Sequence, residues 1–301
     1  MVNPASPLST MDFQRATSLA EALAAKASHP EAVPIAGGTD LMVELNFDHR
    51  RPTVLLDLTA VPELRELSTV DGWVRVGAGV PYTTIVDRLG SELPGLAMAS
   101  RTVGSPQIRN RGTVGGNLGS ASPAGDAHPP LLASDAVVEV ASVRGTRDIP
   151  VGEFFLGVKR NALEPDELIT AVRVPVASGP QQFAKVGTRN AMVIAVCSFA
   201  LALHPDRRAV GTGIGSAAPT PRRATDAEDF AASALDWAGR APLTDDVLDR
   251  FGSLVAAAAS PIDDVRGSAA YRRHALAVLA RRTLTWAWAE YSGQANPARR
   301  A

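Results

Sequence analysis

The chain has 301 residues, 46% of them hydrophobic, and a formal net charge of -1 at pH 7. This length is sufficient for two domains with buried cores, and the near-neutral charge gives no indication of nucleic-acid binding. No apolar run approaches the roughly 18 residues of a membrane-spanning helix, and the N-terminus lacks the basic and apolar segments of a secretory signal. The single cysteine excludes an internal disulfide, so we expect a cytoplasmic location.

The first half of the chain predicts a mixture of helices and short strands. Ser18 and Glu21 have the spacing of a capping box, which predicts a helix from there through Ala27. Four β-rich runs follow, separated by helical or Pro- and Gly-containing segments. They are 53–58, 73–79, 136–141 and 168–174.

The second half has a different order of elements. The segment 176–180 contains Gly and Pro and predicts a linker. Three strands are expected after it, at 182–187, 192–203 and 209–214, and then alanine-rich helices. Strands first and helices later are typical of an α+β arrangement. We therefore predict an α+β fold with one domain over 1–175 and a smaller one, a three-stranded sheet plus helices, over 181–291.

Two glycine-rich turns are the strongest functional signal in the chain. The first contains Gly37 and Gly38, and the second contains Gly115 and Gly116. Because glycine has no Cβ, consecutive backbone N–H groups in such turns can converge on an anion without any lysine. Either pair alone could simply make a tight turn, but two such turns on one face would suit a pyrophosphate.

Polar side chains accompany both turns. Thr39, Thr113 and Asn117 could donate further hydrogen bonds to phosphate oxygens. The segment after the second turn carries two hydroxyls and a carboxylate that could hold a ribose or a ribityl chain; these are Ser120, Ser122 and Asp126. The basic stretch 109–111 raises the local potential for an anion.

Other nucleotide motifs do not fit. A P-loop requires Gly-Lys followed by Ser or Thr, which does not occur here. Gly77 and Gly79 follow a strand as in a Rossmann fingerprint, but Tyr82 occupies the last position of that pattern. The glycine run 211–215 lacks a following helix pattern, and we interpret it as a strand-to-loop turn.

Four stretches, 34–41, 107–117, 121–126 and 216–223, resemble the flavin-binding subunit of the molybdenum hydroxylases. That family includes the medium subunit of carbon monoxide dehydrogenase and the FAD domain of xanthine dehydrogenase. The resemblance covers nearly the whole chain. It implies a two-part FAD-binding domain of the PCMH type, followed by a C-terminal domain of the carbon monoxide dehydrogenase flavoprotein type.

The resemblance also implies which residues contact FAD. The first turn would wrap the pyrophosphate with Pro34, Ile35, Ala36, Gly37, Gly38, Thr39, Asp40 and Leu41. Its other side would be covered by Thr113, Gly115, Gly116 and Asn117. Ser120, Ser122 and Asp126 would face the ribityl and isoalloxazine region, and Ile169 and Lys185 would lie against the flavin. Lys185 at the ring edge would favour the anionic reduced flavin.

One position departs from the family pattern. The segment 189–193 corresponds to a loop at the exposed face of the flavin. Val193 stands where carbon monoxide dehydrogenases carry a tyrosine, so the resemblance does not extend to an aromatic lid over the ring.

By this resemblance the chain is the FAD-carrying electron-transfer subunit of a molybdenum hydroxylase complex. Iron–sulfur clusters are usually held by four thiolates, and one cysteine cannot hold a cluster. The molybdenum cofactor and the two-iron two-sulfur clusters would therefore lie on partners, a molybdenum-binding large subunit and an iron–sulfur small subunit. FAD would pass electrons to NAD or another acceptor. Two alternatives stay open: a self-contained FAD-dependent oxidase or reductase, and a scaffold that has lost its FAD.

Several further residues have two interpretations. Cys197 lies in an apolar strand and is expected to be a core residue rather than a redox thiol. For His128, near the proposed flavin, we favour a structural role over catalysis, and no residue spacing indicates a metal site. A last helix over 269–291 carries Arg272, Arg273, Arg281 and Arg282, which could dock a partner but are expected to form a solvated face. Trp286 and Trp288 cannot share one narrow stripe of that helix, so one is expected to be partly exposed.

Overall fold

The structure is a computed structural model and describes residues 11–294. Up to the linker its elements are β1 (Asp12–Arg15), α1 (Leu19–Ser28), β2 (Val33–Ile35), α2 (Leu41–Asn46), β3 (Val54–Asp57), β4 (Leu67–Val70), β5 (Trp73–Gly77), α3 (Tyr82–Arg88), α4 (Pro94–Thr102), α5 (Pro106–Arg109), α6 (Val114–Ser120), α7 (His128–Ala133), β6 (Val137–Ser142), β7 (Gly145–Pro150), α8 (Val151–Phe154), β8 (Phe155–Gly157), β9 (Arg160–Asn161) and β10 (Leu168–Pro175). After it come β11 (Gln181–Val186), β12 (Cys197–His204), β13 (Ala209–Gly215), α9 (Thr225–Ala234), α10 (Asp245–Ala258) and α11 (Ala269–Ser292). Short 3-10 turns cover Pro62–Arg65 and Pro205–Arg207. The mixed α+β class is confirmed.

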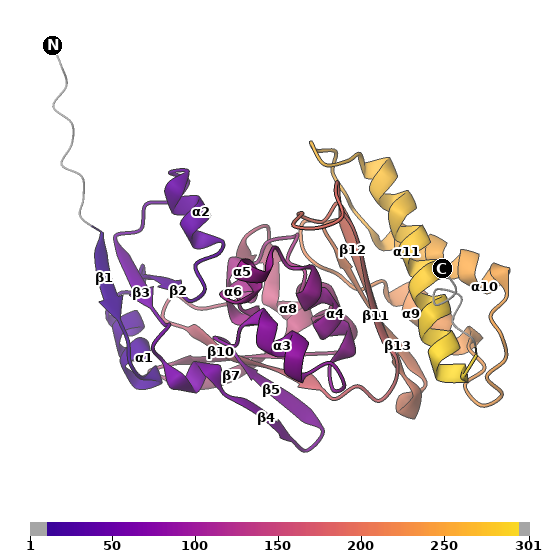
Figure 1. Ribbon diagram of the computed structural model, residues 1–301, viewed down its shortest axis with the longest axis horizontal. Coiled ribbons are helices and arrows are strands. Elements are labelled where there is room, and N and C mark those ends of the chain that lie inside the picture. Colours follow the sequence, from indigo (N-terminus) through magenta and orange to yellow (C-terminus); the bar gives the residue numbers. More distant parts are fainter. Residues whose placement is uncertain (1–10, 295–301) are drawn as a thin grey trace, which may run out of the picture.

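A small parallel sheet of order β1-β3-β2 begins the chain and lies at one end of the molecule (Figure 1). Helix α1 begins as predicted, because the side chain of Ser18 accepts the N–H of Glu21. The carboxylate of Glu21, however, accepts from Thr17 rather than from Ser18. The chain then leaves β2 through the first glycine turn into α2.

A five-stranded antiparallel sheet, β4-β5-β10-β6-β7, forms the centre of the molecule. The runs predicted at 73–79, 136–141 and 168–174 are its three inner strands. The edge strands β4 and β7 were not predicted. Nearly all of their residues are exposed or half-buried, so their sequences lack the alternation that marks a half-buried strand.

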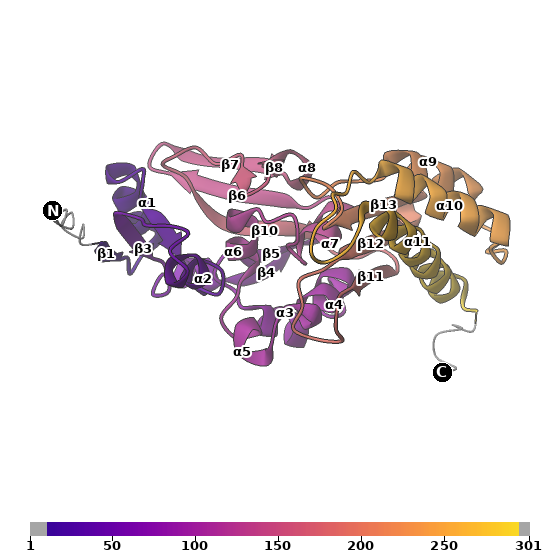
Figure 2. The same cartoon turned by 90° about the horizontal axis from the view of Figure 1, so that it is seen from above.

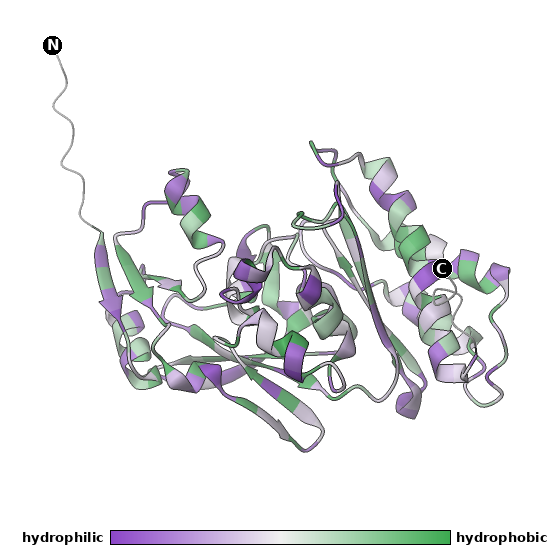
Figure 3. Cartoon of the chain, in the orientation of Figure 1, coloured by the Kyte–Doolittle hydropathy of each residue, from purple (hydrophilic) through white to green (hydrophobic). Residues whose placement is uncertain are grey.

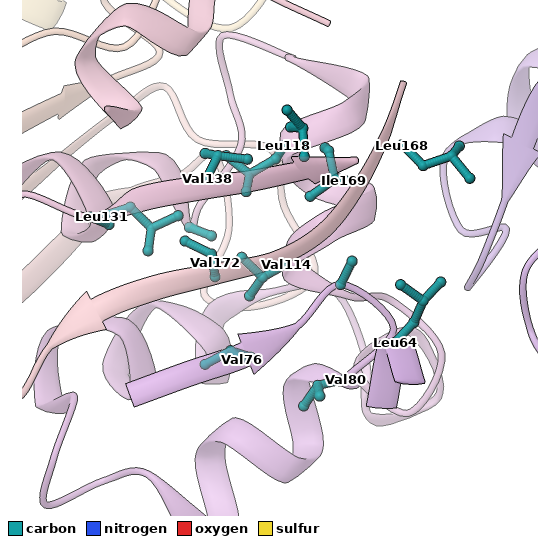
Figure 4. Packing of buried hydrophobic residues seen from close by; sticks show 14 of the residues in the cluster. Leu64, Val76, Val80, Val114, Leu118, Leu131, Val138, Leu168, Ile169 and Val172 are labelled. Atoms are coloured by element: carbon teal, nitrogen blue, oxygen red, sulfur yellow. The ribbon is translucent and has the colours of Figure 1, made fainter. Parts of the chain in front are cut away.

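Helices cover one face of this sheet, and α3, α4 and α6 lie above it in Figure 1. In the close-up of the core, Val114 and Leu118 of α6 lie near Ile169 and Val172 of β10 (Figure 4). Val138 of β6 belongs to the same buried cluster. Helix α6 is therefore fixed against the central strand. Gly115 and Gly116 belong to the first turn of this helix, so the second glycine turn is held in place with it.

The C-terminal part is built on an antiparallel sheet of order β11-β12-β13. Helices α9, α10 and α11 lie beyond this sheet, on the side away from the N-terminal part (Figures 1 and 2). Helices α4 and α7 of the N-terminal part contact it as well. The segment 176–180 forms the predicted connection between β10 and β11.

The glycine run 211–215 is a correction to the sequence interpretation, because it lies within β13 and is not a turn. A Cβ added at Gly211 would overlap the carbonyl oxygen of Ala133, and one at Gly213 would overlap that of Pro129. Both carbonyls belong to α7. Alternate positions of a strand share one face, so glycines two residues apart let the backbone of α7 approach the sheet directly.

Two further expectations for this part need correction. Strand β12 begins at Cys197 rather than at 192, because the residues before it form a loop. Arg272 is buried and does not belong to a solvated face. Its guanidinium donates to the carbonyl oxygens of Val196 (2.7 Å) and Ser216 (2.5 Å) and pairs with Asp264.

For the rest of α11, the expected partial exposure of one of the two tryptophans is confirmed. Arg273 and Arg282 are exposed, and Arg281 is half-buried and pairs with Asp249. Trp288 is buried against Trp237 and Tyr291, whereas Trp286 is half-exposed. Within residues 11–294, no helix has both the length and the apolar composition needed to cross a membrane.

Candidate functional site

A cavity of about 1120 Å³ brings the two glycine turns together. It is large enough for a dinucleotide, since pockets for small ligands run from roughly 300 to 1,000 Å³. All of the predicted site residues except Lys185 line it: Pro34, Ile35, Ala36, Gly37, Gly38, Thr39, Asp40, Leu41, Thr113, Gly115, Gly116, Asn117, Ser120, Ser122, Asp126 and Ile169.

The first turn presents unpaired backbone donors to this cavity. Gly38 has φ +71°, a backbone conformation that residues other than glycine rarely adopt. Within the described residues, the N–H groups of 37–40 donate to no protein acceptor. Buried or half-buried donors without partners indicate that a ligand or water accepts from them.

The two turns also touch each other. A Cβ added at Gly37 would overlap the carbonyl oxygen of Arg111, which lies just before the second turn. Gly37 is therefore required by the contact between the turns, whatever the cavity holds. This contact sets the spacing of the two groups of donors.

The second turn is the start of α6. Thr113 caps this helix, since its hydroxyl accepts the N–H of Gly116 at 2.9 Å. A Cβ at Gly115 would overlap Ala78, so glycine allows α6 to pack closely there. A Cβ at Gly116 would approach only the hydroxyl of Thr113, and otherwise meets open space. The first N–H groups of a helix have no partner within it and attract negative charge.

Asp126 connects the cavity to the C-terminal part. Its Oδ2 lies 2.6 Å from Nζ of Lys185 on β11, and that ammonium also donates to the carbonyl oxygen of Thr102 at 3.2 Å. Burial raises the pKa of Asp126, and the Lys185 ammonium opposes this shift. Lys185 itself does not line the cavity. The Lys185 ammonium therefore pairs with Asp126, and Asp126 separates it from the cavity.

Three buried polar atoms belong to residues that line the cavity and have no protein hydrogen-bond partner in the described structure. They are Oδ1 of Asn117, Oδ1 of Asp126 and the hydroxyl of Tyr82. Buried polar groups are normally hydrogen-bonded, so a polar ligand fits this surface. The sequence interpretation found Asn117 and Asp126 but missed Tyr82, because a single tyrosine at a helix start carries no motif.

His128 lies behind this surface and does not line the cavity. Its Nε2 is 3.1 Å from the carbonyl oxygen of Asn117, and its ring lies 4.5 Å from that of Phe155. Burial lowers the pKa of His128 to about 4, so the imidazole is neutral at physiological pH. These contacts support the position of Asn117 and agree with a structural role.

The cavity is also lined by basic residues that the sequence interpretation missed. They are Lys26, Arg50, Lys159 and Arg160. Lys159, beside the β8–β9 hairpin, pairs with Glu44 of α2. Helix α2 has no buried residue, and both hydrophobic and hydrophilic residues occur along its ribbon (Figure 3). This ion pair therefore joins α2 to the other wall of the cavity.

The C-terminal part contributes a loop to the mouth of the cavity. Met192, Val193 and Ile194 line it, and Met192 and Ile194 are more than half exposed. The predicted correspondence of 189–193 with a loop near the ligand agrees with this position. Because its residue 193 is valine, this position supplies no aromatic side chain at the cavity.

Comparison with known proteins identifies the family. Residues 9–177 match the model of the FAD-binding domain in molybdopterin dehydrogenase, and residues 182–287 match the carbon monoxide dehydrogenase flavoprotein C-terminal domain. The chain belongs to this family of FAD-binding oxidoreductase subunits. Most of the residues that line the cavity lie in the part of the chain that matches the FAD-binding domain.

Individual relatives agree over nearly the full length. The xanthine dehydrogenase FAD-binding subunit of Escherichia coli O157:H7 is 30% identical over 295 residues, covering 94% of this chain and 97% of that protein. The nicotine 6-hydroxylase medium subunit of Paenarthrobacter nicotinovorans is 36% identical over 263 residues, covering 85% and 89%. A chain of carbon monoxide dehydrogenase from Hydrogenophaga pseudoflava superposes with a TM-score of 0.86 at 26% identity, covering 96% and 99%.

Cys197 agrees with its predicted role in this flavoprotein subunit. It is fully buried in β12, and burial raises the pKa of its thiol to about 12. A buried thiol with this pKa is not a ready nucleophile or ligand. Among residues 11–294, no group of three or more metal-binding side chains comes together.

Proposed function

We propose that this chain is the electron-transfer subunit of a molybdenum hydroxylase complex and that it holds FAD between its two glycine turns. The observation that carries the proposal is the single cavity that both turns line, with free N–H groups at 37–40 in the first turn and the start of α6 in the second. Neither turn is built around a lysine, so the binding of a pyrophosphate would depend on backbone N–H groups and on the α6 terminus.

Different residues would contact different parts of the cofactor. The N–H groups of 37–40 and the start of α6 would hold the pyrophosphate. Asn117 and Asp126 each have a free buried oxygen that would accept from ribityl hydroxyls, with Ser120 and Ser122 beside them. Ile169 would contact the flavin as an apolar surface.

FAD would supply the redox chemistry, accepting electrons from iron–sulfur clusters on a partner and delivering them to NAD or another acceptor. The protein supplies binding, orientation and electrostatics. Lys185 would act on the flavin through Asp126, because the ammonium pairs with that carboxylate. Its effect on the reduction potential is expected to be smaller than that of an unpaired lysine at the ring edge.

The cysteine count and the relatives support the proposal of partner subunits. One cysteine cannot hold an iron–sulfur cluster, so the clusters and the molybdenum cofactor would lie on a small and a large subunit. Relatives are named as medium subunits or medium chains of a nicotine hydroxylase and a glyceraldehyde dehydrogenase, which indicates multi-subunit enzymes. The organic substrate would react on the large subunit.

The proposal is tested by purifying the chain with whatever copurifies under gentle conditions and recording visible spectra before and after the partners are separated. FAD on this chain, with iron–sulfur absorption and molybdenum on the partners, would support it. A lone yellow protein that turns over a small substrate would establish the self-contained oxidase or reductase instead. A colourless chain that cannot be loaded with FAD would indicate a scaffold.

A further inference from the structure

Tyr82 is a buried cavity residue whose hydroxyl has no protein partner. It is the first residue of α3, only 2% exposed, and it lines the cavity. A buried hydroxyl without a partner destabilises a fold. The residue enters no nucleotide-binding motif, since it is the one that breaks the Rossmann pattern after Gly77 and Gly79.

The backbone fixes Tyr82 where the two glycine turns meet. Its N–H donates to the carbonyl oxygen of Gly112 at 3.0 Å, and the preceding Pro81 bridges to Thr113. A Cβ added at Gly112 would lie 3.4 Å from the Tyr82 ring and 3.3 Å from the hydroxyl of Thr39. The ring is therefore next to residues of both turns and is held there by main-chain contacts.

The surroundings keep the hydroxyl protonated. Burial raises the pKa of Tyr82, and the negative charge of Asp126 raises it further. Thr39 from the first turn and Asp126 with its partner Lys185 are the polar groups identified near this position. A protonated phenol that donates to no neighbour is available as a hydrogen-bond donor.

We propose that the hydroxyl of Tyr82 donates a hydrogen bond to an oxygen in the central chain of bound FAD, either a phosphate oxygen or a ribityl hydroxyl, and so positions the cofactor between the two turns. This inference rests on the proposed function. It adds a residue to the FAD site that no glycine motif marks.

The test compares the three tyrosines of the full-length chain. Tyr82→Phe removes only the hydroxyl, and the dissociation constant for FAD is measured by quenching of flavin fluorescence. We expect it to rise roughly three- to tenfold, the effect of losing one neutral hydrogen bond. The urea midpoint of the FAD-free protein should stay the same or rise, because an unpaired buried group is removed.

The other two tyrosines supply the controls, one with the opposite pattern and one with no expected change. The hydroxyl of Tyr291 already donates to the carbonyl oxygen of Trp237 at 3.2 Å, so Tyr291→Phe should lower the urea midpoint and leave FAD affinity unchanged. Tyr271 is 49% exposed, and Tyr271→Phe should change neither quantity.

Two partial ligands distinguish the acceptor oxygen. If Tyr82→Phe weakens ADP as well as FAD, the bond is to a phosphate oxygen; if it weakens riboflavin and not ADP, the bond is to a ribityl hydroxyl. Unchanged FAD affinity in Tyr82→Phe, or a loss of stability like that of Tyr291→Phe without a loss of affinity, would overturn the inference while the proposed function stands. A wild-type chain that binds no FAD would overturn both.

Discussion

Two glycine-rich regions of this protein use the same residue for opposite purposes. At 37–38 and 115–116, glycines lie in a turn and at a helix start, and they line a cavity. At 211–215, glycines alternate within β13, where their backbone groups are paired in the sheet and their missing side chains admit α7. The first region is suited to a ligand, and the second joins the two halves of the chain.

The comparison shows that the number of glycines in a segment does not indicate its role. What matters is whether the surrounding backbone already uses the N–H groups. In β13 the neighbouring strand accepts the N–H groups of these glycines, so the glycines serve only close packing. At the turns no protein acceptor is present for 37–40 within the described structure, so binding remains possible.

The largest expected effect is the loss of packing at β13. Gly213→Val would drive a side chain into the carbonyl of Pro129, and we expect the free energy of unfolding to fall by more than about 3 kcal/mol. Urea unfolding followed by circular dichroism measures it. Gly90→Val is the control, because a Cβ there meets nothing within 4 Å. Equal stability of the two variants would contradict the packing role.

The ion pair across the same interface gives the next effect. Lys185→Met would leave the buried carboxylate of Asp126 without its cation and should cost about 3 kcal/mol near neutral pH. The pKa of Asp126 would then lie further above its unfolded value, so stability should recover as the pH falls and the carboxyl is protonated. The more accessible pair of Arg281 and Asp249 is the control, and Arg281→Met should cost less than about 1 kcal/mol. Similar losses in both variants would argue against a buried pair.

A smaller effect concerns the support of the second turn by His128. Its pKa of about 4 in the folded protein lies below the unfolded value, so the unfolded chain binds a proton first as the pH falls. Stability is fully present above about pH 6.5 and is lost toward pH 4; near pH 5 the loss is about 2 kcal/mol. Urea titrations of wild type and His128→Gln at about pH 7.5 and 5 measure it. We expect a flatter profile for the variant, and identical profiles would show that His128 is not the responsible group.

The smallest effect separates binding from folding at the cavity. Gly116→Ala would place a methyl group in open space beside Thr113, and we expect FAD affinity to fall about tenfold, or about 1.4 kcal/mol. Since alanine favours a helix over glycine, the FAD-free protein should be as stable or up to about 1 kcal/mol more stable. Fluorescence titration and urea unfolding give the two quantities. A parallel loss of both would place Gly116 with the packing glycines of β13.

Much of the fold was predictable because its inner strands are buried. The apolar composition of the runs at 53–58, 73–79, 136–141 and 168–174 predicted strands there, and the capping residues predicted the start of α1. The edge strands β4 and β7 were not, since most of their residues face solvent. Arg272 was expected in solvent because a helix pattern does not show that three carbonyl and carboxylate groups from elsewhere surround one guanidinium.

Residue type and spacing were sufficient to find the two glycine turns, the polar residues that follow the second one and the lack of enough cysteines for a cluster. That both turns line one cavity, that Lys185 pairs with Asp126 beside it and that the Tyr82 hydroxyl has no protein partner there became visible only in the folded chain. Local backbone freedom is encoded in a few neighbouring residues, whereas the partner of a buried polar group comes from a distant segment that only packing brings near.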